Sequence, residues 1–364
     1  MIIGVPKEIK NNENRVGLTP ESVFQLVNEG NKVIVETLAG DGIGATDSDY
    51  EKSGAKVVKN AATVFDEADL IVKVKEPQEE EFRLIKSHHT IFTYLHLAAE
   101  EKLTKALLKS GCTAIAYETI TDNNGRLPLL KPMSEVAGRM SIQVGAKYLE
   151  KTNGGSGILL GGVPGVQRGQ VTIIGGGISG INAAEMAIGL GAEVTVLDRS
   201  LDVLEKIEAR FGGRVKTLYS NSKNVENSVQ NSDLVVGAVL IPGASAPKIV
   251  TRNMIRKMKT KSVVVDIAID QGGCFQTSKP TSHEHPIFEV DGVIHYCVTN
   301  MPGAVPRTSS YALNNATLPF ISKLASIGCW SKFAELDSHF MNGVNVANGK
   351  LKNSVIIETF PHLS

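Results

Sequence analysis

The stretch VTIIGGGISG, residues 171–180, decides the fold of the middle of this chain. An apolar run ends at Gly175, Gly177 and Gly180, and a run with helical character, AAEMAIGLG, follows directly. The spacing G-x-G-x-x-G between a strand and a helix is typical of a dinucleotide-binding turn. Its glycines permit the tight turn, the approach of a pyrophosphate and close packing of helix on strand. The alternative is a glycine-rich turn that binds no ligand.

Asp198 ends the next predicted strand, VTVLD at 194–198. A carboxylate in this place accepts hydrogen bonds from the adenosine ribose and repels a 2′-phosphate. The sequence therefore predicts NAD as the cofactor in preference to NADP, although the neighbouring Arg199 weakens that preference. The alternative role for Asp198 is to cap the helix that follows it.

Strand and helix patterns alternate on both sides of this turn. Because such alternation produces parallel sheets with right-handed crossovers, we predict an α/β fold with two doubly wound parallel-sheet domains. No glycine fingerprint follows the first strand of the chain, so only the second domain is predicted to bind a dinucleotide. The predicted strands cover residues 2–6, 32–36, 70–75, 90–95 and 113–118, and then 171–175, 193–198, 214–219, 234–239, 262–269 and 293–298.

The tail of the chain, from about residue 307, begins with a helical pattern but is too short to form a domain. We therefore predict that it returns to complete the first domain. In this interpretation residues 1–130 and 307–364 form a discontinuous catalytic domain. A Rossmann domain of residues 131–306 is inserted into it and binds NAD.

The composition indicates a soluble globular protein, with 42% apolar and 21% charged residues among 364. Lys plus Arg equals Asp plus Glu at 38 each, so no net field attracts nucleic acid or an anionic membrane. No apolar run approaches the roughly 18–20 residues that span a bilayer, and the first residues lack the order of a signal peptide. The four cysteines are widely spaced, as is usual in a reducing compartment. These features predict a cytoplasmic protein without nucleic-acid or membrane partners.

Open α/β sheets bind ligands beyond the carboxyl ends of their strands. In the first domain these ends carry Arg15, Lys75, His96 and Glu118, a set that suits a small anionic substrate. Arg15 can clamp a carboxylate with two hydrogen bonds. The alternatives are a solvated loop arginine for Arg15, an edge-strand lysine beside Lys73 for Lys75, and a buried core histidine for His96.

In the second domain, Asp266 and Asp270 flank the end of the predicted strand 262–269. Asp270 precedes Gln-Gly-Gly, where the strand opens at the sheet edge. A carboxylate there can exchange protons with a substrate or pair with a lysine or imidazole. The alternative is a turn carboxylate that caps its own backbone.

Taken together, these segments resemble the alanine dehydrogenase family, which shares its fold with the alpha part of proton-translocating transhydrogenases. The resemblance runs along nearly the whole chain. It implies NAD-dependent, reversible oxidative deamination of L-alanine to pyruvate and ammonia by a homohexamer. A transhydrogenase alpha-type nucleotide-binding subunit is the alternative. The segments that carry the resemblance are MIIGVPKEIKNNENRVGLTP, VKVKEPQ, TYLHLA, PLLKPMSEVAGRM, IGGGISG, DIAIDQGGCFQTSKPTSHEHP and VTNMPGAVPRTSSYALNNATLP.

The resemblance also implies roles for individual residues. Arg15 and Lys75 correspond to the substrate-binding pair, and His96 and Asp270 correspond to the catalytic pair. Some family members bind a metal ion through an acid and a histidine in the segment that reads LPFISKLASIG here, so no metal is expected. The residues that correspond to NAD contacts are Ser134, Gly175, Gly177, Ile178, Ser179, Gly180, Asp198, Ser220, Val239, Leu240, Ile267, Ala268, Ile269, Asp270, Val298, Thr299, Asn300 and Met301.

Overall fold

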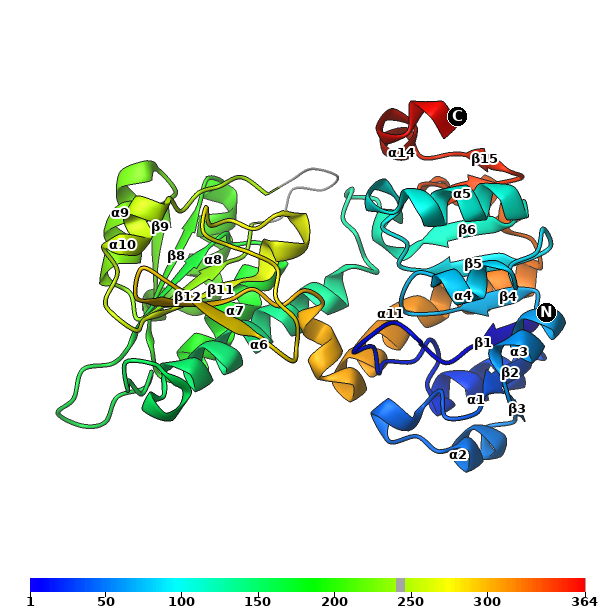
Figure 1. The fold of residues 1–364 in the computed structure, drawn as a ribbon, viewed down its shortest axis with the longest axis horizontal. Coiled ribbons are helices and arrows are strands. Elements are labelled where there is room, and N and C mark those ends of the chain that lie inside the picture. The colour runs from blue at the N-terminus through cyan, green and yellow to red at the C-terminus, as the bar shows by residue number, and fades with distance from the viewer. Residues whose placement is uncertain (240–245, 364) are drawn as a thin grey trace. The chain divides into compact units, whose positions relative to one another are not determined.

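The computed structural model describes residues 1–239 and 246–363. Leu240, one of the predicted NAD contacts, lies outside the described residues. The chain forms two compact units, which Figure 1 shows as ribbons. The first unit is Met1–Met133 with Val305–Ser364, and the second is Ser134–Ala304.

The first unit contains an eight-stranded sheet in the order β15-β14-β6-β5-β4-β1-β2-β3. Strands β1 to β6 are parallel, whereas β14 and β15 add an antiparallel edge. In Figure 1 the red β15 and α14 lie beyond β6 and α5, so both ends of the chain build this sheet. Its strands are β1 (Ile2–Val5), β2 (Lys32–Glu36), β3 (Lys56–Val58), β4 (Leu70–Val72), β5 (Thr90–Thr93), β6 (Thr113–Ala116), β14 (Val344–Ala347) and β15 (Lys350–Leu351).

Local capping signals set the ends of several helices of this unit. Thr19 accepts the Ser22 N–H before α1, whose first residue is a proline, and Gly111 ends α5 in the left-handed conformation. The helices are α1 (Pro20–Asn28), α2 (Asp47–Lys52), α3 (Ala61–Glu67), α4 (Glu79–Phe82), α5 (Glu101–Ser110), α11 (Pro306–Ile327), α12 (Trp330–Leu336), α13 (Ser338–Met341) and α14 (Ser354–Thr359).

One hydrophobic core joins the first strands to the tail of the chain. Ile91 and Ala114 of the parallel strands pack in the same buried cluster as Val346, Leu351 and Ile356 of the last residues. Burial of side chains of this size stabilises by about 1.5–3 kcal/mol each. The tail is therefore an integral part of this unit's core.

The second unit contains a seven-stranded sheet in the order β12-β13-β11-β10-β7-β8-β9. Six strands are parallel, and β12 pairs antiparallel with β13 at the edge. The strand order reverses between β7 and β10, where doubly wound sheets place their ligands. The strands are β7 (Gln170–Ile174), β8 (Glu193–Asp198), β9 (Val215–Tyr219), β10 (Leu234–Gly237), β11 (Val263–Asp266), β12 (Ile287–Val290) and β13 (Val293–Tyr296).

Among its described residues, this second part of the fold has five α-helices, and the first of them, α6, begins at the boundary between the units. The strands β7, β8, β9 and β10 alternate with α7, α8 and α9, as the sequence pattern predicts for mononucleotide-binding halves. The helices are α6 (Lys131–Leu149), α7 (Ile178–Gly189), α8 (Leu201–Phe211), α9 (Ser222–Asn231) and α10 (Arg252–Arg256).

The predicted α/β class with two sheets is confirmed, but the sheets are not wholly parallel. Antiparallel pairing near the sheet edges, of β12 with β13 and of β14 with β6 and β15, adds to the predicted parallel strands. Several predicted strands also run past the observed ends, by three residues in two cases: 70–75 ends at Val72, and 262–269 ends at Asp266, where the 3₁₀ helix η6 (Ile267–Gln271) begins.

Within the described residues, no helix combines the length and apolar character that crossing a membrane requires.

Candidate functional site

The glycine turn of the second unit has the geometry that a dinucleotide requires. Gly175 has a φ of 101°, in a region that favours glycine, and a methyl group on it would lie 2.8 Å from the carbonyl oxygen of Ala238. A methyl group on Gly180 would overlap the carbonyl oxygen of Gly175, which explains the close packing of α7 on β7. A methyl group on Gly177 would meet no heavy atom within 4 Å among the described residues. The backbone is therefore open at Gly177, where a pyrophosphate would approach.

Asp198 ends β8 beside this turn. Its carboxylate accepts the N–H of Gly176 at 2.7 Å and the N–H of Ser200 at 2.8 Å, and its carbonyl accepts the N–H of Ser220 at 2.9 Å. The side chain therefore fixes the glycine turn to β8. A carboxylate offers about four acceptor positions, so these two bonds leave capacity for ribose hydroxyls. The N-cap of α8 is Ser200 rather than Asp198.

Helix α6 contacts the start of α7 through small residues. Ser179 donates its hydroxyl to the carbonyl oxygen of Ser134 at 3.0 Å. A methyl group on Gly138 would overlap the carbonyl oxygen of Ser179, so the two helices approach closely only because residue 138 is glycine. Ser134 and Ser179, both predicted NAD contacts, thus lie together at the N-terminus of α7, where free backbone N–H groups favour an anion.

The other predicted NAD contacts follow the carboxyl ends of the neighbouring strands. Val239 comes after β10, residues 267–270 form η6 after β11, and residues 298–301 follow β13. Asn300 has a φ of 57°, and its carbonyl oxygen lies 3.1 Å from Nε2 of His283. The described contacts of the sequence prediction therefore line one edge of one sheet.

Asp266 and Asp270 differ sharply in their surroundings. Asp266 is fully buried and accepts the N–H groups of Ala268 and Cys274 and, at 2.5 Å, the hydroxyl of Ser278. Burial raises the pKa of its carboxyl, and these hydrogen bonds oppose that rise. Asp270 is exposed on η6. The role of capping the backbone belongs to Asp266, and Asp270 is the carboxylate accessible to a ligand.

In the first unit, Arg15 is buried against a carboxylate. Its side chain is 2% exposed, and it donates to Glu13 from Nε at 2.7 Å and from Nη2 at 2.5 Å. Its Nη1 also lies 3.1 Å from the sulfur of Met133. Burial alone would lower the pKa of the guanidinium, but Glu13 raises it. The alternative of a solvated loop arginine is wrong, and one edge of the guanidinium fork is occupied by Glu13.

Lys73 and Lys75 lie beyond the end of β4, a central strand, so the edge-strand interpretation is wrong. Lys73 is fully buried between Glu8 at 3.2 Å and Glu81 at 2.9 Å. Burial would lower the pKa of Lys73, but the two carboxylates outweigh this effect and raise it. Glu8 also accepts the N–H groups of Val74 at 2.6 Å and Lys75 at 3.3 Å. This ionic cluster fixes the backbone that carries the half-buried Lys75.

His96 follows β5 and has an exposed side chain, with 46% of its area accessible. The alternative of a core histidine is therefore wrong. The backbone N–H of His96 donates to Oε1 of Glu118 at 2.6 Å, and Nδ1 of the imidazole lies 3.9 Å from the same oxygen. The imidazole also lies parallel to the ring of Tyr94, with centroids 6.0 Å apart. An accessible imidazole between a carboxylate and an aromatic ring can exchange protons with a ligand.

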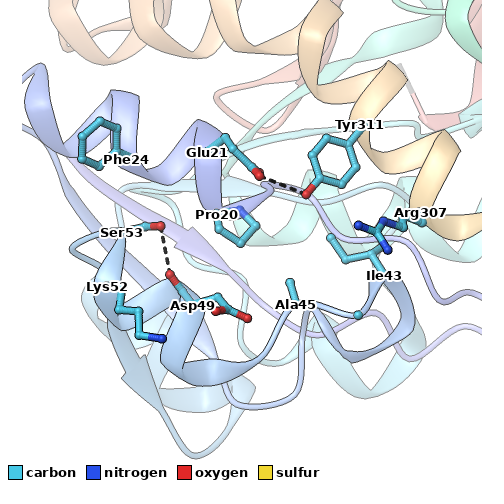
Figure 2. Close-up of a pocket in the computed structure, with 11 residues that line it drawn as sticks. Pro20, Glu21, Phe24, Ile43, Ala45, Asp49, Lys52, Ser53, Arg307 and Tyr311 are labelled. Atoms are coloured by element: carbon cyan, nitrogen blue, oxygen red, sulfur yellow. Dashed lines mark hydrogen bonds between the residues drawn. The ribbon is translucent and has the colours of Figure 1, made fainter.

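A separate hollow of about 450 Å³ lies on the surface of the first unit (Figure 2). It is lined by α1, α2 and the start of α11. Figure 2 shows the hydrogen bond that the hydroxyl of Tyr311 donates to the carboxylate of Glu21 there. None of the residues predicted from the sequence lines it. This hollow is therefore not the candidate site.

The structure thus groups the predicted residues by unit. Arg15, Lys75 and His96 belong to the first unit, whereas Asp270 and the glycine turn belong to the second. Sequence reasoning missed the buried carboxylates of Glu8, Glu13 and Glu81, which pair with Arg15 and Lys73. Glu8 and Glu13 stand in the same charged segment as Arg15, but nothing in that pattern indicates their burial.

Family models match both parts of the chain. The model described as "Alanine dehydrogenase/PNT, N-terminal domain" matches residues 4–137, and "Alanine dehydrogenase/PNT, C-terminal domain" matches residues 141–354. An alanine dehydrogenase from Halomonas elongata is 58% identical over 360 residues, covering 99% of this chain and 97% of that protein. One from Staphylococcus epidermidis is 55% identical over 361 residues, with coverages of 99% and 97%.

Solved structures give the same picture. A structure named L-alanine dehydrogenase superposes with a TM-score of 0.97 at 51% identity and covers 100% of both chains. A transhydrogenase from Sinorhizobium meliloti superposes with a TM-score of 0.84 at 25% identity, covering 97% of this chain and 99% of the other. The similarity to the dehydrogenase is thus the greater of these two by both measures.

Proposed function

The chain belongs to the alanine dehydrogenase/PNT family, and from this premise we propose that it catalyses the reversible oxidative deamination of L-alanine to pyruvate and ammonia with NAD. One observation carries the proposal. Identity of 55–58% to alanine dehydrogenases extends along 99% of the chain, and so includes the unit that carries Arg15, Lys75 and His96. A shared nucleotide-binding domain alone would not specify a reaction.

The glycine turn fits NAD. The open space at Gly177 and the N-terminus of α7 suit a pyrophosphate, and the Asp198 carboxylate suits an unphosphorylated ribose. When bound, NAD supplies a nicotinamide ring that accepts the hydride from the α-carbon of alanine. The proposed contacts are those of the second unit: Ser134, the 175–180 turn, Asp198, Ser220, Val239, residues 267–270 and residues 298–301.

The substrate is a small zwitterion, and the proposed roles of the first unit follow from its charges. Arg15 binds the carboxylate of alanine. Lys75 assists this binding and polarises the carbonyl that forms. The pair of Arg15 with Glu13 restrains the guanidinium, so Arg15 contributes orientation, and Lys75 contributes additional positive charge.

Deamination also requires proton transfers. Loss of hydride leaves an iminium carbon, which water attacks to give a carbinolamine, and this species expels ammonia. His96 is the proposed general acid and base for these steps, because its imidazole is exposed and an imidazole can both donate and accept a proton. Asp270 is proposed to activate the water or to balance the developing positive charge, and it is accessible on η6.

The test of this function is a turnover assay. The protein is mixed with NAD and L-alanine, and the absorbance of reduced nicotinamide is followed. We expect rapid reduction with L-alanine, little with larger amino acids, and a weaker response with NADP. A protein that binds NAD but reduces none of it with any amino acid would contradict the proposal. Hydride exchange between two nucleotides without amino acid would instead identify a transhydrogenase-type subunit, the alternative that the more distant Sinorhizobium meliloti structure represents.

We further propose a cytoplasmic homohexamer. The four cysteines, Cys112, Cys274, Cys297 and Cys329, are free thiols, which supports a reducing compartment. The hexamer rests on the family resemblance, and light scattering coupled to gel filtration measures it directly. No metal ion is proposed as a cofactor.

A further inference from the structure

His96 has an uncommon backbone conformation. Its φ of 50° and ψ of 36° place a non-glycine residue in the left-handed region, which is unfavourable and persists only where neighbouring groups hold the backbone. The carboxylate of Glu118 supplies that restraint. It accepts the N–H of Leu95 at 3.1 Å and 3.3 Å and the N–H of His96 at 2.6 Å.

Glu118 is itself held in place. It lies on the 3₁₀ helix η3 (Tyr117–Thr119), directly after the buried strand β6, and its side chain is only 14% exposed. Its Oε1, which accepts the N–H of His96, also lies 3.9 Å from Nδ1 of the same residue. One carboxylate oxygen thus faces both the backbone and the ring of His96.

A second residue, Tyr94, lies beside the imidazole of His96. The imidazole lies within 7° of parallel to the ring of Tyr94. Tyr94 is fixed in turn, because its hydroxyl donates to the carbonyl oxygen of Leu129 at 2.6 Å and its side chain is buried. In the observed orientation of the imidazole, Nδ1 is the nitrogen that faces the carboxylate of Glu118.

We propose that Glu118 is the positioning residue of His96, holding its backbone and selecting the tautomer with the proton on Nδ1. A carboxylate only accepts hydrogen bonds, so the ring nitrogen that faces it must carry the proton. Nε2 is then the nitrogen that takes a proton from the substrate and returns it. The gap of 3.9 Å closes by a small rotation of the ring, since catalytic hydrogen bonds commonly tighten when substrate binds. This inference rests on the proposed function of His96.

The variant Glu118→Gln tests the inference. The amide oxygen of glutamine still accepts the backbone N–H groups, but the negative charge that favours a proton on Nδ1 is lost, so the selection of this tautomer is weakened. We expect kcat for L-alanine to fall about 10- to 100-fold, the range typical of residues that orient a functional imidazole. The KM for L-alanine, the affinity for NAD and the melting temperature should change little.

A second measurement reports the tautomer without turnover. The ¹⁵N spectra of protein labelled only at histidine distinguish the two neutral tautomers, and loss of one signal in His96→Asn assigns His96. We expect the proton of the wild-type ring on Nδ1 and a mixture of tautomers in Glu118→Gln. Glu118→Asp keeps the charge one methylene farther away, and should retain more kcat than Glu118→Gln.

Glu101→Gln is the matched control. Glu101 also contacts a histidine, with Oε1 2.9 Å from Nε2 of His362, but both residues are exposed and lie outside the proposed site. It should leave kcat and the His96 signal unchanged. Wild-type kcat or an unaltered tautomer in Glu118→Gln would overturn the inference, as would joint loss of kcat and NAD affinity. Failure of the wild-type protein to oxidise L-alanine would instead refute the proposed function, while the spectra would still test the hydrogen bonding of His96.

Discussion

At the scale of single residues, the first unit buries its charges together with partners. Arg15 lies against Glu13, and Lys73 lies between Glu8 and Glu81, all with almost no solvent exposure. An unpaired charge in such a place would cost several kcal/mol. These pairs therefore allow cations to be held rigidly next to the segments that carry the proposed substrate-binding groups.

The first prediction concerns His96. His96→Asn should lower kcat for L-alanine by about 10²–10⁴-fold, the usual contribution of a general acid or base. Asparagine tolerates the left-handed backbone of residue 96, so the loop should keep its conformation. Affinity for NAD, measured by fluorescence titration, should be unchanged, because the glycine turn belongs to the other unit. The control is His362→Asn, an exposed histidine. Equal loss of NAD affinity would indicate misfolding and contradict the assigned role.

The second prediction concerns the stability of the first unit at acidic pH. His89 is buried, its Nδ1 accepts the N–H of Lys86 at 2.9 Å, and its Nε2 lies 2.7 Å from the carbonyl oxygen of Phe65. Burial lowers the pKa of His89 from 6.5 to about 4. Because the folded state holds the neutral ring, its stabilising contribution is complete above pH 6.5 and is lost as the pH falls toward about 4.

Denaturant unfolding at several pH values measures this effect. Between pH 6.5 and about 4, the free energy of unfolding of the wild-type protein should fall by up to about 3 kcal/mol more than that of His89→Gln. Glutamine can still donate to Phe65 but does not titrate. The variant is expected to be less stable at neutral pH, so the comparison concerns the slopes. Identical slopes would show that protonation of His89 does not limit acid stability.

At the scale of elements, the strand β7, the glycine turn and the helix α7 form the segment that binds the dinucleotide in the proposed function. The three glycines of this element act differently. Gly180 brings the helix against the strand, whereas Gly177 leaves backbone exposed where a methyl group would meet no described atom within 4 Å. Residue 180 must therefore be glycine for the helix to pack, whereas residue 177 is expected to be glycine for the ligand to approach.

The third prediction uses that difference. Gly180→Ala should lower the free energy of unfolding by about 1–3 kcal/mol, because its methyl group overlaps the Gly175 carbonyl and forces the helix away. Gly177→Ala, at a φ of −69° that alanine adopts readily, should leave the melting temperature unchanged. It should nevertheless weaken the binding of NAD at least about tenfold. This factor corresponds to a loss of roughly 1.4 kcal/mol of binding free energy, which we expect from a small displacement of the pyrophosphate. Tight NAD binding by Gly177→Ala would contradict the assignment of this turn.

Most of the strands that the sequence predicted have a continuous or nearly continuous buried run, β9 being an exception. VTII at 171–174 and VVV at 263–265 are strands buried on both faces, so their apolar residues are unambiguous. The strands β3, β12 and β15 escaped prediction because they are short or partly exposed edge strands. In β14 the buried Asn345 breaks the pattern, and it is accommodated because its Oδ1 accepts the hydroxyl of Thr119 at 3.1 Å.

The candidate site was predictable to the extent that it follows the ends of strands. Arg15, Lys75, His96 and Asp270 were found in that way. Glu118 was found in the same way, but its contact with His96 was not, because that contact depends on a left-handed backbone that no propensity indicates. The burial of Glu13 likewise depends on how the loop after β1 folds back on itself.

At the scale of the whole molecule, the first unit is made from both ends of the chain. Strand β14 pairs antiparallel with β6 through Val344 with Ile115 and Val346 with Ala114, and Val346 is fully buried. The tail therefore covers an edge of the sheet whose β5 and β6 precede His96 and Glu118. Without it, the unpaired backbone of β6 and the apolar surface beneath would meet water.

The fourth prediction tests this dependence with a chain that ends at Met341. It lacks β14, β15 and α14, and so loses the side chains of Val346, Leu351 and Ile356 from the shared core. Each contributes about 1.5–3 kcal/mol, together comparable with the whole stability of a typical domain. Hydrogen exchange followed by mass spectrometry should show fast exchange in peptides of β5 and β6 and unchanged protection in β7, β8 and β9. L-alanine turnover should be lost.

A chain that ends at Phe360 is the matched control, because it removes only the last residues after α14 and keeps all three of these side chains. It should exchange as the full chain does and oxidise L-alanine at the full rate. Equal loss of protection in both units of the shorter chain would mean that the second sheet also depends on the tail. That result would contradict the view that each unit holds its own core, since the buried cluster of the second unit contains, among the described residues, none after Ala304.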